Sequence, residues 1–175
     1  MRLLVICALS YTGFLRYDEL SNIKRNNITF HEEYVNIVIE KSKTDCYRNG
    51  KNVLIAKLNT PQCPVTILQC YIREAKIDLS TDKYIFRPLI YFKRNKNYMM
   101  RNSNIKLSYT RAREIIREAL SSIGINMNNY GLHSFRTGEV NAAYKCSVPD
   151  RLFKVHGRWK SENANDGYVC EDLEK

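Results

Sequence analysis

Residues 131–168 read GLHSFRTGEVNAAYKCSVPDRLFKVHGRWKSENANDGY. His133 and Arg136 are three positions apart, so they lie on one helical face or in one turn of backbone. An imidazole beside a guanidinium fork suits a phosphate, whose oxygens accept bidentate hydrogen bonds. Tyr168 follows late in the chain, where its hydroxyl is a candidate covalent nucleophile. In the alternative interpretation, His133 and Arg136 cap a helix and Tyr168 is one of twelve ordinary tyrosines.

The wider pattern resembles the C-terminal active-site block of the tyrosine recombinase (phage integrase) family. That block carries H-x-x-R, then His or Trp, then a nucleophilic tyrosine nine residues later. The residues that match it are His133, Arg136, Trp159 and Tyr168. His156 lies three positions before the expected His/Trp position, and we assign it to a helix end or to a supporting position behind the site instead.

The family also has an arginine near the start of the catalytic domain and a lysine on a β-hairpin. Arg16 occurs in LRYDEL, which resembles the family's L-R-x-x-E-L, and Glu19 can orient its guanidinium. Thr12-Gly13-Phe14-Leu15-Arg16 has one residue more than the contiguous T-G-L-R of the family. The lysine is Lys43, and Lys41 is the rival for its role.

Composition indicates an anionic partner. The chain of 175 residues has a net charge of +10, and its pI is near 9.4. This excess favours nucleic acid or an anionic membrane surface as the partner. We see no apolar run long enough to span a bilayer and no signal peptide, and the scattered cysteines are typical of an intracellular protein. With three histidines, none near a cysteine, and no paired carboxylates, the sequence predicts no metal site and no cofactor.

Periodicity predicts an α+β fold, mostly helical with a small antiparallel three-stranded sheet. Alternation over 34–39, with partners at 28–30 and 53–55, indicates the strands, and Asn49-Gly50 is a turn signal. A further short strand is expected at 84–86. Helices are expected at 3–14, 17–24, 64–75, 109–123 and 137–144, and from about 150 to 157. The whole chain is expected to be one catalytic domain, residues 1–175, without the N-terminal core-binding domain of the family.

Residues 78–101 have no clear period and are predicted to form a loop. Basic side chains alternate there with aromatic ones, which suits a loop along a phosphate backbone, and an ordinary solvated loop is the equal alternative. The DNA-binding candidates are Lys41, Lys93, Arg94, Lys96 and Arg101.

The resemblance implies cleavage and rejoining of double-stranded DNA through a 3′-phosphotyrosine link, as in DNA recombination or integration by a mobile element. Arg16 and Arg136 would hold the phosphate, His133 would assist proton transfer, Trp159 would add a donor, and Lys43 would protonate the leaving 5′-oxygen. Other recombinase subunits would be partners in a tetrameric synapse, with no membrane partner, in the nucleus or the cytoplasm. Two alternatives stay open: a non-catalytic basic DNA-binding remnant, and a type IB topoisomerase-like enzyme.

Overall fold

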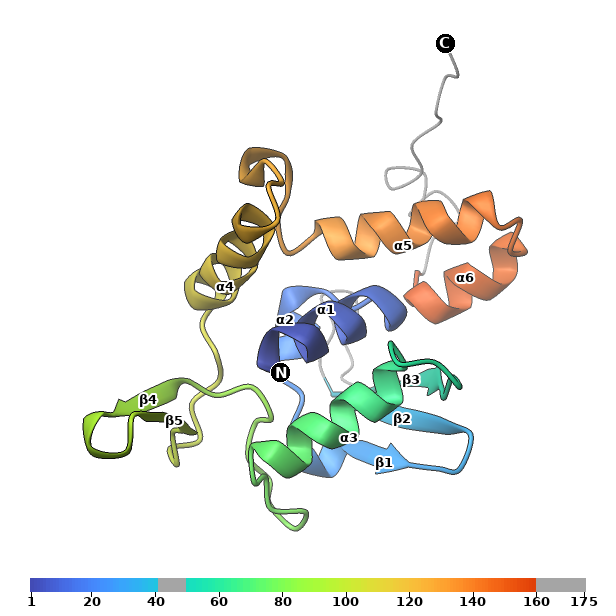
Figure 1. The fold of residues 1–175 in the computed structure, drawn as a ribbon. Coiled ribbons are helices and arrows are strands. Elements are labelled where there is room, and N and C mark those ends of the chain that lie inside the picture. Colours follow the sequence, from blue (N-terminus) through green and yellow to red (C-terminus); the bar gives the residue numbers. More distant parts are fainter. Residues whose placement is uncertain (41–49, 160–175) are drawn as a thin grey trace.

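The computed structural model of the protein describes residues 1–40 and 50–159 (Figure 1). The helices are α1 (Arg2–Thr12), α2 (Tyr17–Ser21), α3 (Pro64–Glu74), α4 (Tyr109–Ser122), α5 (Ser134–Lys145) and α6 (Asp150–Gly157). The strands are β1 (Ile28–Phe30), β2 (Tyr34–Ile39), β3 (Lys51–Ala56), β4 (Leu89–Phe92) and β5 (Asn97–Met100). Short 3-10 turns are η1 (Arg25–Asn27), η2 (Lys93–Asn95) and η3 (Met127–Asn129).

The predicted three-stranded antiparallel sheet is confirmed, in the order β1-β2-β3. Alternate residues of β2 are buried, so one face of the sheet joins the core. The pairing of β2 with β3 extends as far as Ile39 opposite Lys51. Gly50 has a φ of +63°, as the turn signal predicts.

The main core lies where α1 and α3 meet the sheet. Val5, Ile6 and Leu9 of α1 are fully buried and pack with Val35 and Ile37 of β2 in one apolar cluster. A smaller cluster forms around Phe14 of the α1–α2 connection and Val140 of α5. The second cluster ties the C-terminal helices to the end of α1, and this junction positions the candidate site.

The helices at 64–75 and 109–123 occur with nearly the expected bounds. The helix expected at 17–24 ends at Ser21, and that expected at 137–144 begins earlier, at Ser134, so that it includes Arg136. The strand expected at 84–86 is wrong. Tyr84 makes an isolated bridge to Lys24, while Ile85 and Phe86 are buried without forming a strand.

The loop predicted over 78–101 is also wrong in part, because β4 and β5 form an antiparallel hairpin there. The hairpin projects from the body of the molecule beside α3 and α4 (Figure 1). All of β4 and most of β5 are exposed, including apolar side chains. Both faces of each strand carry apolar residues, so the polar–apolar alternation that normally reveals a strand is missing.

No helix in residues 1–40 and 50–159 is both long enough and apolar enough to cross a bilayer.

Candidate active site

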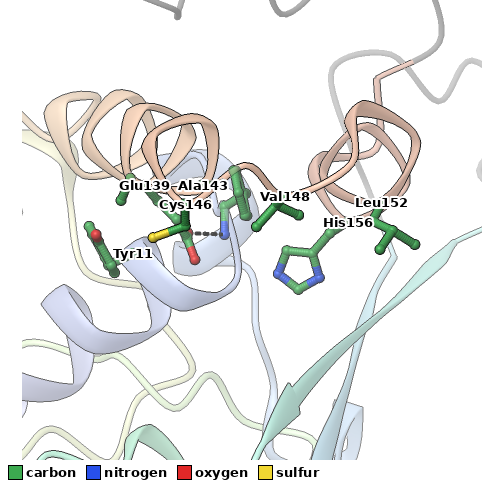
Figure 2. A pocket seen from close by; sticks show the side chains of 9 residues that line it. Tyr11, Glu139, Ala143, Cys146, Val148, Leu152 and His156 are labelled. Carbon is green, nitrogen blue, oxygen red and sulfur yellow. Dashed lines mark hydrogen bonds between the residues drawn. The ribbon is translucent and has the colours of Figure 1, made fainter.

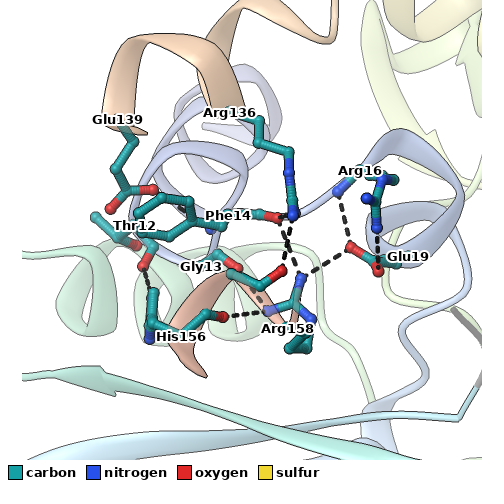
Figure 3. A network of polar contacts seen from close by, with 10 residues as sticks. Thr12, Gly13, Phe14, Arg16, Glu19, Arg136, Glu139, His156 and Arg158 are labelled. Atoms are coloured by element: carbon teal, nitrogen blue, oxygen red, sulfur yellow. Dashed lines mark hydrogen bonds and ion pairs between the residues drawn. The ribbon is translucent and has the colours of Figure 1, made fainter. Parts of the chain in front are cut away.

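The candidate site forms around the turn between α1 and α2. Phe14 in this turn has a φ of +47°, a left-handed conformation that is uncommon for a residue with a side chain. Its carbonyl oxygen accepts hydrogen bonds from the guanidinium groups of Arg136 and Arg158 (Figure 3). The stretch that is one residue longer than T-G-L-R therefore contains the left-handed Phe14, and the carbonyl oxygen of Phe14 fixes two arginines.

Arg16 is the N-cap residue of α2, and Glu19 holds it in place. The Glu19 Oε2 atom accepts a hydrogen bond of 2.9 Å from the Arg16 backbone N–H. Its Oε1 atom lies 3.5 Å from Arg16 Nη1. The Arg16 side chain is 21% exposed while that of Glu19 is 1% exposed. The contact that the spacing of these two residues predicts is present, and part of the Arg16 guanidinium faces solvent.

Arg136 lies in the first turn of α5 and is fully buried. Besides its bond to Phe14, its guanidinium donates to the Gly157 carbonyl oxygen at 2.7 Å. Its guanidinium carbon lies 4.7 Å from the Trp159 ring centroid, a cation–π contact. These contacts orient Arg136 between α5, the α1–α2 turn and the end of α6.

The positive charges of Arg136 and Arg16 both act on His133. This histidine directly precedes α5 and is exposed. Partial burial lowers the pKa of its imidazole, and the positive charges of Arg136 and Arg16 lower it further. Arg16 contributes to this shift although it is more than a hundred positions away in the sequence. The lowered pKa favours the neutral ring, which can accept a proton.

Arg158 is a site residue that sequence reasoning missed. It ends α6 in a left-handed conformation and is 4% exposed. Its Nη2 atom lies 2.9 Å from Glu19 Oε2 and 3.1 Å from the Phe14 oxygen. Its Nη1 atom donates to the Gly13 and His156 carbonyl oxygens, each at 3.0 Å. No local pattern could have revealed it, because its carboxylate partner lies 139 positions away.

Trp159 and His156 pack around the same turn. The Trp159 ring meets the Phe14 ring edge-on at 5.8 Å, so it has a packing role. A Cβ atom on Gly157 would lie 2.1 Å from the Trp159 ring, which requires glycine there. His156 lies in the last turn of α6, and its Nε2 atom is 2.8 Å from the carbonyl oxygen of Thr12. This agrees with its assignment to a helix end.

Glu139 lines a cavity of about 510 Å³ between the end of α1, α5 and α6 (Figure 2). Its Oε2 atom accepts from the Phe14 backbone N–H at 3.4 Å. Burial raises the pKa of Glu139 to about 8, although the Phe14 N–H and the charges of Arg136 and Arg158 oppose the shift. Glu139 therefore carries a proton near neutral pH while it supports the turn that holds both arginines.

Replacing Glu139 with glutamine should flatten the pH dependence of stability. The folded protein binds this proton more tightly than the unfolded chain, where the pKa is near 4.5. The stability gained is complete below that value and is lost as the pH rises through about 8. Between about pH 5 and pH 9, the free energy of unfolding should fall by roughly 2 kcal/mol more in the wild type than in Glu139→Gln. This magnitude is discounted because the carboxyl group borders a cavity.

Urea unfolding at a series of pH values measures this difference. Glu32→Gln, at an exposed position between β1 and β2, is the matched control and should keep the wild-type slope. Identical slopes in Glu139→Gln and the wild type would contradict the assignment of the raised pKa.

The remaining predicted residues fall into two groups. Lys41, Lys43 and Tyr168 lie outside the described residues. The other DNA-binding candidates are all exposed on the β4–β5 hairpin or directly after it: Lys93, Arg94, Lys96 and Arg101. Within residues 1–40 and 50–159, no three His, Cys, Asp or Glu side chains are grouped closely enough to hold a metal ion.

Comparison with known proteins identifies the architecture. No protein-family model matches the chain. An integrase/recombinase xerD homolog of Selenomonas ruminantium is 24% identical over 162 residues, covering 92% of this chain and 45% of that protein. The chain thus spans less than half the length of this curated relative.

Solved recombinase structures share the fold. XerH bound to its palindromic difH substrate matches 97% of this chain and 42% of its own, with a TM-score of 0.69 and 16% identity. XerA matches 97% of this chain and 52% of its own, with a TM-score of 0.67 and 16% identity. The Tn1549 transposon integrase in complex with circular intermediate DNA matches 96% of this chain and 53% of its own, with a TM-score of 0.59 and 10% identity. The chain therefore has the fold of these recombinases and is similar in sequence to the xerD homolog.

Proposed function

We propose that this chain cleaves and rejoins double-stranded DNA as the catalytic domain of a tyrosine recombinase, residues 1–175. The observation that carries the proposal is the hydrogen-bonded turn between α1 and α2, where Phe14 accepts from Arg136 and Glu19 holds Arg16, so that arginines from two distant parts of the sequence meet. Two guanidinium groups beside one imidazole form a cationic site that can stabilise a phosphate in its transition state. XerH is bound to its difH substrate and the Tn1549 integrase to circular intermediate DNA, which supports the same kind of substrate here.

In the proposed reaction, Tyr168 Oη attacks the scissile phosphorus, so the Oη–P bond forms and the P–O5′ bond breaks. The phenolic proton passes toward His133, whose lowered pKa keeps the ring able to accept it. Lys43 gives a proton to the leaving 5′-oxygen, with Lys41 as the alternative donor. Arg16 and Arg136 hold the non-bridging oxygens, and Trp159 donates from its indole N–H. The phosphotyrosine link conserves the bond energy, so the strand can be rejoined to a new 5′-hydroxyl.

A nicked suicide substrate tests this proposal. The wild-type chain should form a covalent adduct with the DNA, and Tyr168→Phe should form none, because no other tyrosine replaces the nucleophile. Strand exchange between two duplexes would indicate a recombinase, and adducts without exchange would indicate a type IB topoisomerase-like enzyme. Salt-sensitive DNA binding without any adduct would leave the non-catalytic remnant and refute the catalytic proposal.

The basic hairpin is the proposed DNA contact outside the catalytic centre. From Lys83 to Arg113 the sequence contains no aspartate or glutamate. Lys93, Arg94 and Lys96 are exposed at the tip of the hairpin, beside the paired rings of Tyr91 and Tyr98, 4.9 Å apart. This places cations and aromatic side chains on one projecting element, as suits a phosphate backbone.

Lys93→Gln with Arg94→Gln should therefore weaken DNA binding similarly for all sequences. A plot of the logarithm of the association constant against the logarithm of the salt concentration has a negative slope. The magnitude of this slope should decrease by about one for each phosphate that the protein no longer neutralises. Fluorescence anisotropy with a labelled duplex over a salt series measures both quantities. Arg73→Gln, an exposed position on α3, is the control and should leave the slope unchanged. An unchanged slope in the double variant would mean that the tip is merely solvated.

The partners and the location follow from this function. We propose that other recombinase subunits assemble with the chain on DNA and that it works in the nucleus or the cytoplasm, where its DNA substrate is found. Sedimentation of the chain with a duplex that carries two sites would test the assembly, since a synapse contains more than one duplex.

A further inference from the structure

A second cavity, of about 680 Å³, lies far from the candidate active site. Residues from the start of α1, the end of α3 and the β4–β5 hairpin line it. The active-site turn follows the other end of α1, and eleven helical residues span roughly 16 Å. This volume is within the usual range for a site that binds a small molecule.

Arginine side chains give this cavity its charge. Arg2, Lys76 and Arg87 line it, against one carboxylate, that of Glu74. Glu74 lies 3.9 Å from Arg73, on α3, and within residues 1–40 and 50–159 no carboxylate lies within ion-pair distance of Arg2 or Arg87. The cavity therefore has a net positive charge.

Arg87 is the buried member of this group. It is 6% exposed, and its Nη1 atom donates to the Arg101 carbonyl oxygen at 2.9 Å. Its Nε atom is buried and has no hydrogen-bond partner in the described part of the chain. Arg2 Nη1 donates to the Arg87 carbonyl oxygen at 3.1 Å, which keeps the two residues together. Burial lowers the pKa of both arginines, as expected for cations held without a counter-charge.

A further part of the lining is apolar and aromatic, formed by Leu89, Tyr98, Met99 and Met100 of the hairpin. An anionic end beside the arginines and a flat apolar body against the hairpin would match both parts of the lining.

We infer that this cavity is a phosphate-binding site, with Arg2 and Arg87 as the ligands of the phosphoryl group. The phosphate can belong to a free nucleotide-sized ligand or to a DNA backbone that the basic hairpin brings to the cavity. The first source is independent of the proposed function, and the second rests on it. In both cases the apolar wall accommodates the organic part that is attached to the phosphate.

Thermal unfolding in deoxyadenosine 5′-monophosphate tests the site, with sodium chloride at the same ionic strength as the reference. At a hundredfold excess over the dissociation constant, the wild-type Tm should rise by about 5 °C. Arg2→Gln should lose this rise, and Arg87→Lys, which keeps the charge but not the fork, should reduce it. Arg73→Gln, an exposed arginine outside the cavity, should keep it. No rise in the wild type, or an equal rise in Arg2→Gln, would overturn the inference.

Duplex binding by the same variants identifies the source of the phosphate. A weaker affinity and a lower salt slope in Arg2→Gln would identify a DNA phosphate, and an unchanged affinity together with the absence of a Tm rise would identify a free ligand. Neither readout depends on covalent adducts. An inactive chain would refute the catalytic proposal and leave the thermal result intact.

Discussion

Arg136→Ala is expected to abolish covalent adduct formation on a nicked suicide substrate, with a rate loss of at least about a thousandfold. In the proposed reaction, this guanidinium offsets charge that builds on the phosphate oxygens. It also bonds the Phe14 and Gly157 carbonyl oxygens and lies against Trp159, so its loss disturbs the turn beside Arg16 as well. Single-turnover kinetics with labelled DNA measure the rate directly.

Loss of folding must be separated from loss of chemistry, because Arg136 is fully buried. Arg136→Lys keeps a cation but lacks the planar fork, and it should remain folded with a rate well below that of the wild type. Thermal melts and DNA affinity at low salt report folding and binding in both variants. Arg113→Ala, an exposed position on α4, is the matched control and should retain activity. Wild-type adduct rates in Arg136→Ala would rule out its assigned role.

Arg158→Met is expected to destabilise the fold by about 3–5 kcal/mol, because it removes one partner of a buried ion pair. Glu19 is 1% exposed and would keep its bonds to Arg16, while its 2.9 Å ion pair with Arg158 would be broken. The carbonyl oxygens of Gly13, Phe14 and His156 would lose a donor as well. Methionine retains much of the apolar stem, so the destabilisation reports mainly on the polar interactions.

Urea unfolding of a double-mutant cycle isolates the pair. Glu19→Gln should restore part of the stability in the Arg158→Met background, because an amide is less costly to bury without a cation than a carboxylate is. Adduct formation should also fall in Arg158→Met, since Glu19 and the turn position Arg16. A loss of stability below about 1 kcal/mol, with no coupling to Glu19, would show that the pair contributes little.

Local patterns were enough to predict the sheet and two of the longest helices. The alternation over 34–39 and the apolar stripes of α3 and α4 are local patterns, each contained in a short segment of the chain. Within such a segment, the repeat of the strand or helix sets the direction in which each side chain points. The β4–β5 hairpin has no such signal. Its apolar side chains are on both faces and are mostly exposed, so the burial that normally imposes alternation does not operate.

At the candidate site, sequence by itself determined the pairs that lie within one turn of chain. Arg16 with Glu19, and His133 with Arg136, follow from a separation of three residues. Only the tertiary structure decided the contacts that join these pairs: the left-handed Phe14 whose carbonyl holds two arginines, and the Arg158–Glu19 ion pair. The reason is physical. Spacing along the chain determines which neighbours share a helical face, whereas a contact across 139 positions depends on how α6 packs against the end of α1.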